Sequence, residues 1–119
     1  MESDFRNETD PNGLGQHIPG AKLDAGKQRA DLVLEGFARA LEGVIRVGTY
    51  GASKYTDHGW LCVQNGIQRY ADAGRRHYFR RKTGESLDSE SRLLHLEHEA
   101  WNVLAELELT LREMDKEKK

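Results

Sequence analysis

The spacing of apolar residues is the feature that most constrains the fold of this chain. In three segments, apolar residues recur at intervals of three and four, which is the pattern of an amphipathic α-helix. No segment shows the alternation that would indicate a convincing strand. Helices are therefore predicted over residues 27–47, over 61–82, and from Asp88 or Ser89 to about Glu113. Three long helices with short connectors predict an all-α bundle, which we expect oligomerisation to complete.

Glycine and proline positions predict the boundaries between these segments. Residues 1–26 hold both prolines and many Gly, Asp and Asn residues, so a flexible N-terminal arm is expected there. A helical domain is expected over 27–114 and a frayed tail over 115–119. Gly48 and Gly51 should end the first helix and open a connector over 48–59. The pair Asn65-Gly66 weakens the first turn of the second helix, which favours a later start.

Composition excludes several classes of protein. A length of 119 residues suits a single domain, and the net charge of −2 argues against stable nucleic-acid binding. Cys62 is the only cysteine, so neither an intrachain disulfide nor a cysteine-based zinc site is possible. No apolar run approaches the roughly 20 residues that span a membrane, and the N-terminus lacks a signal-peptide pattern. A cytoplasmic protein is therefore expected.

The third helical segment gathers unusual polar residues on one side. At about 100° per residue, four side chains fall within roughly one third of the circumference: His95, His98, Glu99 and Asn102. A separate face is apolar and comprises Leu93, Leu96, Ala100, Val103, Leu107 and Leu111. Histidine and asparagine are uncommon on a solvated helix face, because other polar residues form helices better. The polar face is therefore a candidate for binding metal or substrate, and the alternative is a solvated face.

Two carboxylates border the apolar stripe of the first helical segment. Asp31 and Glu35 are four residues apart and point the same way from a helix. Oxygen ligands of this kind suit Mg²⁺ or Mn²⁺, and the alternative is ordinary surface acids near Lys27 or Arg39. The stripe, expected to be buried, comprises Val33, Leu34, Phe37, Leu41, Val44, Ile45 and Gly48.

Candidate substrate contacts lie in the connector and the second helical segment. Lys54, Arg76 and His77 could neutralise phosphates, Lys as a point charge and Arg as a bidentate fork. Tyr55 and Trp60 could stack on a base, although Trp60 is more readily interpreted as pinning the loop to the core. The chain has no P-loop, no HExxH motif and no nucleophile elbow. A hydrolase would therefore activate water with a metal ion and not use a covalent nucleophile.

An ordered series of short motifs resembles a phage-borne protein family. The motifs are Leu23-Asp24, Asp31-Leu32, Glu35, Gly51-Ala52-Ser53-Lys54-Tyr55, Gly59-Trp60, Arg76-His77, Gly84 to Ser91, His95-Leu96, His98 and Trp101-Asn102. Over about residues 22–110 the chain resembles the dATP/dGTP diphosphohydrolase N-terminal family. One departure is Arg92, where the family more often has glycine after Glu-Ser.

The resemblance implies a MazG-like, all-α nucleotide pyrophosphohydrolase. Such an enzyme would cleave a purine deoxynucleoside triphosphate, dGTP or dATP, to the monophosphate and pyrophosphate. It would use Mg²⁺ or Mn²⁺, form a dimer or tetramer, and act in host cytoplasm in phage nucleotide metabolism, including the supply of dGMP for genomes that contain 2-aminoadenine. The usual MazG-like signature pairs Glu-x-x-Glu with a later Glu-x-x-Asp, and this chain lacks that pattern.

The resemblance also suggests a role for each candidate. Asp31 and Glu35 would hold the metal, and His95, His98 and Asn102 would complete the metal site or serve substrate. Glu35 or Glu99 would accept the proton of the attacking water. The substrate would contact Lys54, Tyr55, Trp60, Arg76 and His77. The rival hypothesis is a non-enzymatic helical module that binds a host protein or nucleic acid through the basic run 75–82.

Overall fold

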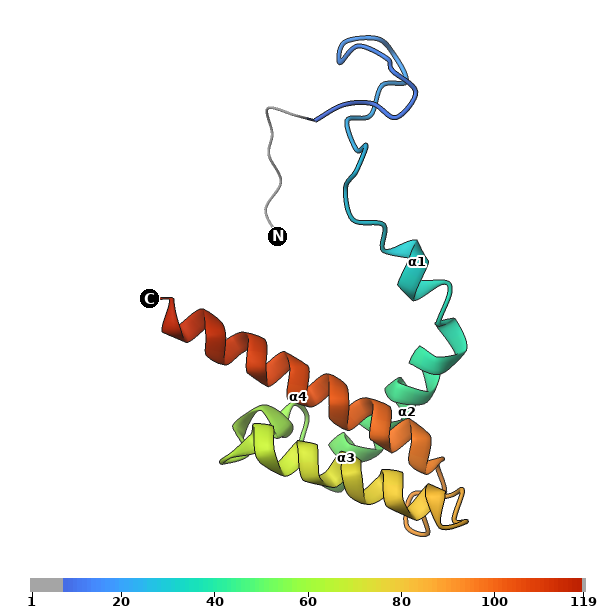
Figure 1. Ribbon diagram of the computed structural model, residues 1–119, viewed down its shortest axis with the longest axis vertical. Coiled ribbons are helices and arrows are strands. Elements are labelled where there is room, and N and C mark those ends of the chain that lie inside the picture. Colours follow the sequence, from blue (N-terminus) through green and yellow to red (C-terminus); the bar gives the residue numbers. More distant parts are fainter. Residues whose placement is uncertain (1–7, 119) are drawn as a thin grey trace. The chain divides into compact units, whose positions relative to one another are not determined.

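The computed structural model describes residues 8–118, which are helical wherever they form regular structure. The elements are α1 (Asp31–Leu34), α2 (Ala38–Lys54), the 3₁₀ helix η2 (Gly59–Cys62), α3 (Gly66–Lys82) and α4 (His95–Glu117), as Figure 1 shows. Over 8–118 the only β feature is an isolated bridge between Leu87 and Leu94. The predicted all-α class is confirmed and agrees with a MazG-like fold. The chain divides between Gly36 and Phe37 into two units, which are described separately.

The first unit contains α1 and a loop organised around Asp10. The Asp10 carboxylate is buried and accepts backbone N–H bonds from Asn12 at 2.7 Å, Leu14 at 3.3 Å and Lys22 at 2.8 Å. These bonds close the loop. They also lower the pKa of Asp10: the bond from Lys22 has the largest effect, and burial acts in the opposite direction. Residues 1–7 of the predicted arm and Lys119 of the predicted tail lie outside the described residues. The flexibility of the arm stays a prediction.

The predicted helix over 27–47 is wrong in its bounds, because two helices stand in its place. The single turn α1 ends at Leu34, and α2 begins only at Ala38. Nor do Gly48 and Gly51 end the helix, since α2 continues to Lys54. A glycine inside a helix costs only about 1 kcal/mol, which the contacts of α2 can outweigh.

The glycines of α2 allow α4 to approach closely. A Cβ atom at Gly43 would collide with the Glu97 side chain, and one at Gly48 would lie 3.3 Å from Trp101 Nε1. Gly43 and Val47 are the buried residues of α2. Gly43 and Gly48 therefore lie on the surface against which α4 packs, whereas Gly51 has no neighbour within 4 Å.

Helices α3 and α4 run antiparallel, side by side, in the second unit (Figure 1). They approach closely at Gly74, where an added Cβ would lie 3.3 Å from Asn102 Cβ. The second predicted helix starts late, at Gly66, because Asn65 adopts a left-handed conformation with φ of +57°. A 3₁₀ turn, η2, precedes it.

The third predicted helix begins later and ends later than expected. It starts at His95 and not at Asp88 or Ser89, because the intervening residues form a loop closed by backbone bonds from Asp88 N–H to Leu93 O and from His95 N–H to Ser86 O. The side chain of Glu97 accepts the Leu94 N–H at 2.9 Å and so caps the true N-terminus. Helix α4 then continues to Glu117, into the stretch expected to fray.

Helix α4 buries part of its polar face and exposes its apolar face, which is the reverse of the usual arrangement in globular proteins. His95, His98, Asn102 and Ala105 are its buried residues. The alternative of a solvated polar face is therefore wrong for those three polar residues. The large apolar side chains of α4 are instead 47% to 55% exposed at Leu96, Val103, Leu107 and Leu111.

The predicted burial of the first apolar stripe is also wrong in the single chain. More than half of the side-chain surface is exposed at Val33, Leu34, Phe37 and Ile45. The apolar core of the described residues is small and comprises Val47, Ala71 and Ala105. Small residues and imidazoles bring the helix backbones of the second unit together, and this leaves the bulky apolar side chains outside.

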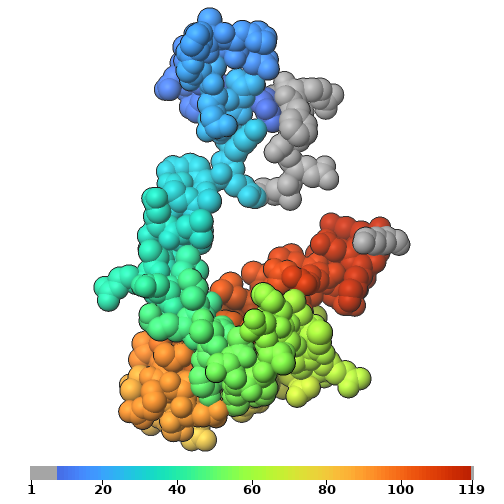
Figure 2. Space-filling view, turned by 180° about the vertical axis from the view of Figure 1, so that it is seen from behind, coloured from blue at the N-terminus to red at the C-terminus, as the bar shows by residue number. Residues whose placement is uncertain are grey.

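The C-terminal part of α4 extends beyond the body of the second unit, as Figure 2 shows in red. Its exposed apolar face is therefore accessible along several turns. Within residues 8–118, no helix has both the length and the apolar character needed to cross a bilayer.

Candidate functional site

A cleft of about 1010 Å³ opens in the second unit, lined by α2, the η2 segment, α3 and the first turns of α4. Its lining includes every residue predicted to contact substrate, together with two of the residues on the polar face of α4. These are Lys54, Tyr55, Trp60, Arg76, His77, His98 and Asn102. The structure thus brings these seven residues to one surface, although their roles stay predictions.

The cationic side of the cleft is balanced by a loop carboxylate. Lys54 Nζ lies 2.8 Å from Glu90 Oε1, and the Tyr50 hydroxyl donates to the same oxygen. The hydrogen bond with Glu90 raises the pKa of Lys54, and the bonds from Lys54 and Tyr50 lower the pKa of Glu90. Arg76 lines the same cleft and is exposed. The Lys54 ammonium group is therefore charged and already paired with the Glu90 carboxylate.

Aromatic residues form one wall of the cleft. Trp60 packs edge to face on Tyr70 at 6.2 Å and on Trp101 at 5.5 Å between ring centroids, and Tyr70 donates its hydroxyl to Trp60 O at 3.1 Å. These contacts pin the η2 segment to α3 and α4. Tyr55 also lines the cleft and remains exposed, so its ring is accessible to a ligand.

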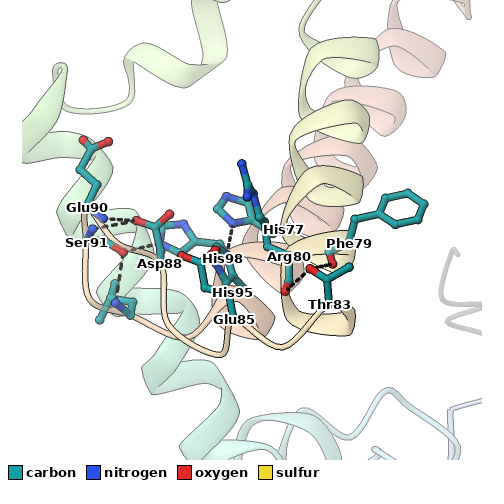
Figure 3. Close-up of polar contacts among 11 residues, drawn as sticks. His77, Phe79, Arg80, Thr83, Glu85, Asp88, Glu90, Ser91, His95 and His98 are labelled. Atoms are coloured by element: carbon teal, nitrogen blue, oxygen red, sulfur yellow. Dashed lines mark hydrogen bonds and ion pairs between the residues drawn. The ribbon is translucent and has the colours of Figure 1, made fainter.

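Three histidines meet where α3 faces the start of α4 (Figure 3). His77 Nδ1 lies 2.8 Å from His95 Nδ1, and the rings of His77 and His98 stack with centroids 4.5 Å apart and planes at 11°. The close approach at Gly74, three residues earlier, directs His77 toward α4. Burial, with the nearby His98 and His95, lowers the pKa of His77 to about 4, and burial also lowers the pKa of His98.

The loop between α3 and α4 adds a carboxylate to the histidines. Asp88 Oδ2 accepts backbone N–H bonds from Ser91 at 2.7 Å and Glu90 at 3.2 Å, and Ser91 Oγ is hydrogen-bonded to His98 Nε2 at 2.7 Å. Burial would raise the pKa of Asp88, but the bonds from Ser91, together with the nearby His98 and His77, lower it. One ligand atom each from His77, Asp88 and His95 lies within 4.8 Å of the others.

Sequence reasoning missed Asp88 as a functional residue because it assigned Asp88 to a helix cap. The residues after it, Ser-Glu-Ser, offer the backbone N–H groups of a turn around an aspartate, and Gly84 precedes it. That turn chemistry was the signal that could have identified a loop here. Glu90 was missed for the same reason, since it was assigned to the first turn of a helix.

Other predicted site residues lie elsewhere. Glu99 is ion-paired with Arg81 Nε at 2.7 Å and is not among the residues that line the cleft. Asp31 and Glu35 belong to the first unit, where Arg29 binds the Asp31 carboxylate through two nitrogens at 2.8 Å and 3.3 Å. The structure therefore does not bring Glu99 into the cleft.

The two predicted histidine ligands on α4 do not match the donor atoms that Mg²⁺ and Mn²⁺ favour. His95 and His98 supply nitrogen, whereas these ions favour carboxylate, carbonyl and water oxygens. Asn102 is buried, and its amide nitrogen donates to His98 O at 2.8 Å. Asp31 and Glu35 supply the carboxylate oxygens that these ions prefer, and Asn102 also has an amide oxygen.

A comparison with protein families gives one match. The model described as dATP/dGTP diphosphohydrolase, N-terminal, matches residues 17–119, which include the whole cleft. Searches of curated proteins and of solved structures returned no match. Since the family match covers most of the chain, the chain belongs to the dATP/dGTP diphosphohydrolase N-terminal family.

Proposed function

We propose that the chain hydrolyses a purine deoxynucleoside triphosphate, dGTP or dATP, between the α- and β-phosphates. The products would be the monophosphate and pyrophosphate. The strongest support is the cleft, whose lining combines cationic side chains with exposed aromatic surface. It occurs in a chain that belongs to a diphosphohydrolase family. A triphosphate needs the cations, and a purine base needs the aromatic surface.

Each cleft residue has a role in this proposal. Lys54 would exchange its Glu90 partner for a phosphate oxygen, and Arg76 would bind phosphate through its planar fork. His77, neutral at pH 7, would offer a hydrogen bond without a charge. Tyr55 would stack on the base, while Trp60, held by Tyr70 and Trp101, would shape the pocket around it.

We also propose that the reaction requires Mg²⁺ or Mn²⁺, with Asp31 and Glu35 as its oxygen ligands. A bound ion of this kind lowers the pKa of a water molecule and neutralises phosphate charge. Glu35 is our proposed proton acceptor, because Arg81 already engages the carboxylate of Glu99. The proposed setting is phage nucleotide metabolism in host cytoplasm, where dGMP would supply genomes that contain 2-aminoadenine.

The exposed apolar faces support a homo-oligomer, a dimer or tetramer. Soluble monomers rarely leave a continuous apolar surface open, and α4 carries one along its length. A second copy of the chain would offer the same face in return.

Incubation of the purified chain with each deoxynucleoside triphosphate and Mg²⁺ or Mn²⁺ tests the proposal. Chromatography should show a purine monophosphate and pyrophosphate in equal amounts. Release of orthophosphate would reject cleavage between the α- and β-phosphates. Absence of turnover, with no rise in melting temperature on adding nucleotide and metal, would favour the rival interaction module.

A further inference from the structure

The contact between His77 and His95 is unusual because two ring nitrogens face each other at 2.8 Å with a carboxylate close by. We propose that His77, Asp88 and His95 bind a divalent transition metal ion of the zinc class. These ligands are different residues from Asp31 and Glu35, which are proposed above to hold Mg²⁺ or Mn²⁺. It would hold an ion that the chain keeps whether or not nucleotide is bound.

The donor set matches the chemistry of zinc and its neighbours. Two imidazole nitrogens and one carboxylate oxygen are typical protein ligands of such ions when a fourth position stays open. With metal–nitrogen bonds of about 2.0–2.1 Å in a tetrahedral site, the two nitrogens would stand roughly 3.3 Å apart. The rings of His77 and His95 would therefore need to separate by only about half an ångström.

The second nitrogen of His95 supports this assignment independently. His95 is 3% exposed, and its buried Nε2 has no hydrogen-bond partner within residues 8–118. Glu85 Oε1 lies 3.7 Å from that atom. A metal at Nδ1 fixes the ring proton on Nε2, which would then donate to Glu85. A carboxylate behind a metal-bound histidine is the common arrangement of such sites.

The other two ligands are already held in place. Both backbone bonds to Asp88 go to Oδ2, so Oδ1 can face a cation. His77 is stacked on His98, which Ser91 holds through its hydroxyl. Metal ligands must be deprotonated, and the lowered pKa of His77 keeps its ring neutral at pH 7. Little reorganisation is therefore needed to accept an ion.

The site lies at a junction between elements and at the edge of the cleft. His77 comes from α3, Asp88 from the loop and His95 from the first residue of α4. An ion would therefore tie the loop to both helices. His77 and Asp88 also line the cleft, so the open coordination position would be accessible from it.

Zinc binding to the full chain tests the proposal directly. The purified protein is stripped with a chelator and titrated with Zn²⁺ alone by calorimetry, with metal analysis after desalting. We expect one ion per chain and a higher melting temperature. Co²⁺ in place of Zn²⁺ should give the intense visible absorption of a four-coordinate site. A folded, stripped chain that binds no zinc would overturn the proposal.

Matched variants locate the ion. Asp88→Asn and His77→Gln should weaken zinc binding at least 100-fold, whereas Asp115→Asn and His58→Gln should leave it unchanged. Glu85→Gln should weaken it about 10- to 100-fold, as loss of an outer partner does. Because the Glu85 side chain is 40% exposed, that variant keeps the test valid if a ligand variant fails to fold. Equal affinity in Asp88→Asn and Asp115→Asn, both folded by circular dichroism, would contradict the site.

Failure of this inference is distinct from failure of the proposed hydrolysis. Zinc binding is measured without nucleotide, and turnover is measured with Mg²⁺ or Mn²⁺. A chain that binds zinc through these residues yet cleaves no triphosphate would retain the metal site and lose the proposed reaction. A chain that cleaves triphosphate but binds no zinc would retain the proposed reaction and reject the zinc site.

Discussion

At the scale of single residues, Arg92 occupies a backbone conformation that favours glycine. Its φ is +64°, in the left-handed region that costs an ordinary residue about 1–2 kcal/mol. A glycine at this position would adopt the same conformation without strain.

We predict that Arg92→Gly leaves the free energy of unfolding unchanged or raises it by up to about 1 kcal/mol, since relief of strain offsets the entropy of glycine. Arg92→Val should lower it by more than about 1 kcal/mol, because a β-branched side chain tolerates this conformation worst. Urea denaturation followed by circular dichroism measures both. A glycine variant clearly less stable than the wild type would show that the Arg92 side chain is itself needed.

His77 should make the metal-free chain sensitive to mild acid. Its pKa is about 4 in the folded chain against 6.5 for the free side chain. Between those values the unfolded state binds more protons, so the free energy of unfolding falls as pH drops from about 6.5 toward 4. Urea midpoints measured in chelator across this range should decline, and His77→Gln should decline less. Parallel slopes for the two proteins would contradict the assignment.

Glu35 is the residue on which the proposed chemistry depends. Glu35→Gln keeps the shape of the side chain but removes the charge that would hold Mg²⁺ or Mn²⁺ and accept a proton. Turnover of dGTP and dATP should fall at least 100-fold while the helical circular dichroism signal is unchanged. Glu113→Gln, on α4, is the control. Wild-type rates in Glu35→Gln would reject the role.

The candidate site was predictable where it depends on helix geometry and not where it depends on a turn. His98 and Asn102 were singled out because their spacing puts them on one face, and both line the cleft. Asp88 was not, because an aspartate that caps a helix and one that organises a loop look alike in sequence. The left-handed conformation of Arg92 distinguishes the loop from a helix here, and that conformation is known only from the structure.

At the scale of elements, α4 shows why the inward face could not be predicted. The spacing correctly separated a polar face from an apolar one. Which face turns inward depends on what packs against it. Here α2 and α3 offer glycines, alanine and His77, which suit close contact with His95, His98 and Asn102.

Replacement by alanine should change the free energy of unfolding in opposite directions at Gly74, where α3 packs on α4, and at Gly51 of α2, which has no close neighbour. Gly74→Ala should lower the free energy of unfolding by about 1–2 kcal/mol, because its Cβ would press on Asn102 Cβ at 3.3 Å, an atom fixed to the backbone. Gly51→Ala should raise it by about 0.5–1 kcal/mol, since nothing lies within 4 Å and alanine favours the helix. Thermal melts of the two variants compare them directly. The same sign in both would contradict the packing described.

At the scale of the whole molecule, the exposed apolar faces predict self-association. Leu107→Glu on α4 should shift the sedimentation profile toward the monomer, because an ionised carboxylate cannot be buried in an apolar interface without a partner. Lys116→Glu, at an exposed polar position of α4, should not. A wild-type chain that sediments as a monomer at all concentrations would rule out the oligomer.

The exposed leucines of α4 also determine how the stability of this protein depends on its concentration. If folding within one chain buries imidazoles and an amide, most of the apolar driving force is left for association with a second copy. Folding and assembly then become one equilibrium, and its midpoint depends on the amount of protein in the tube. Dilution should therefore act on this chain as a denaturant does, and a melting temperature quoted without a concentration would have no fixed meaning.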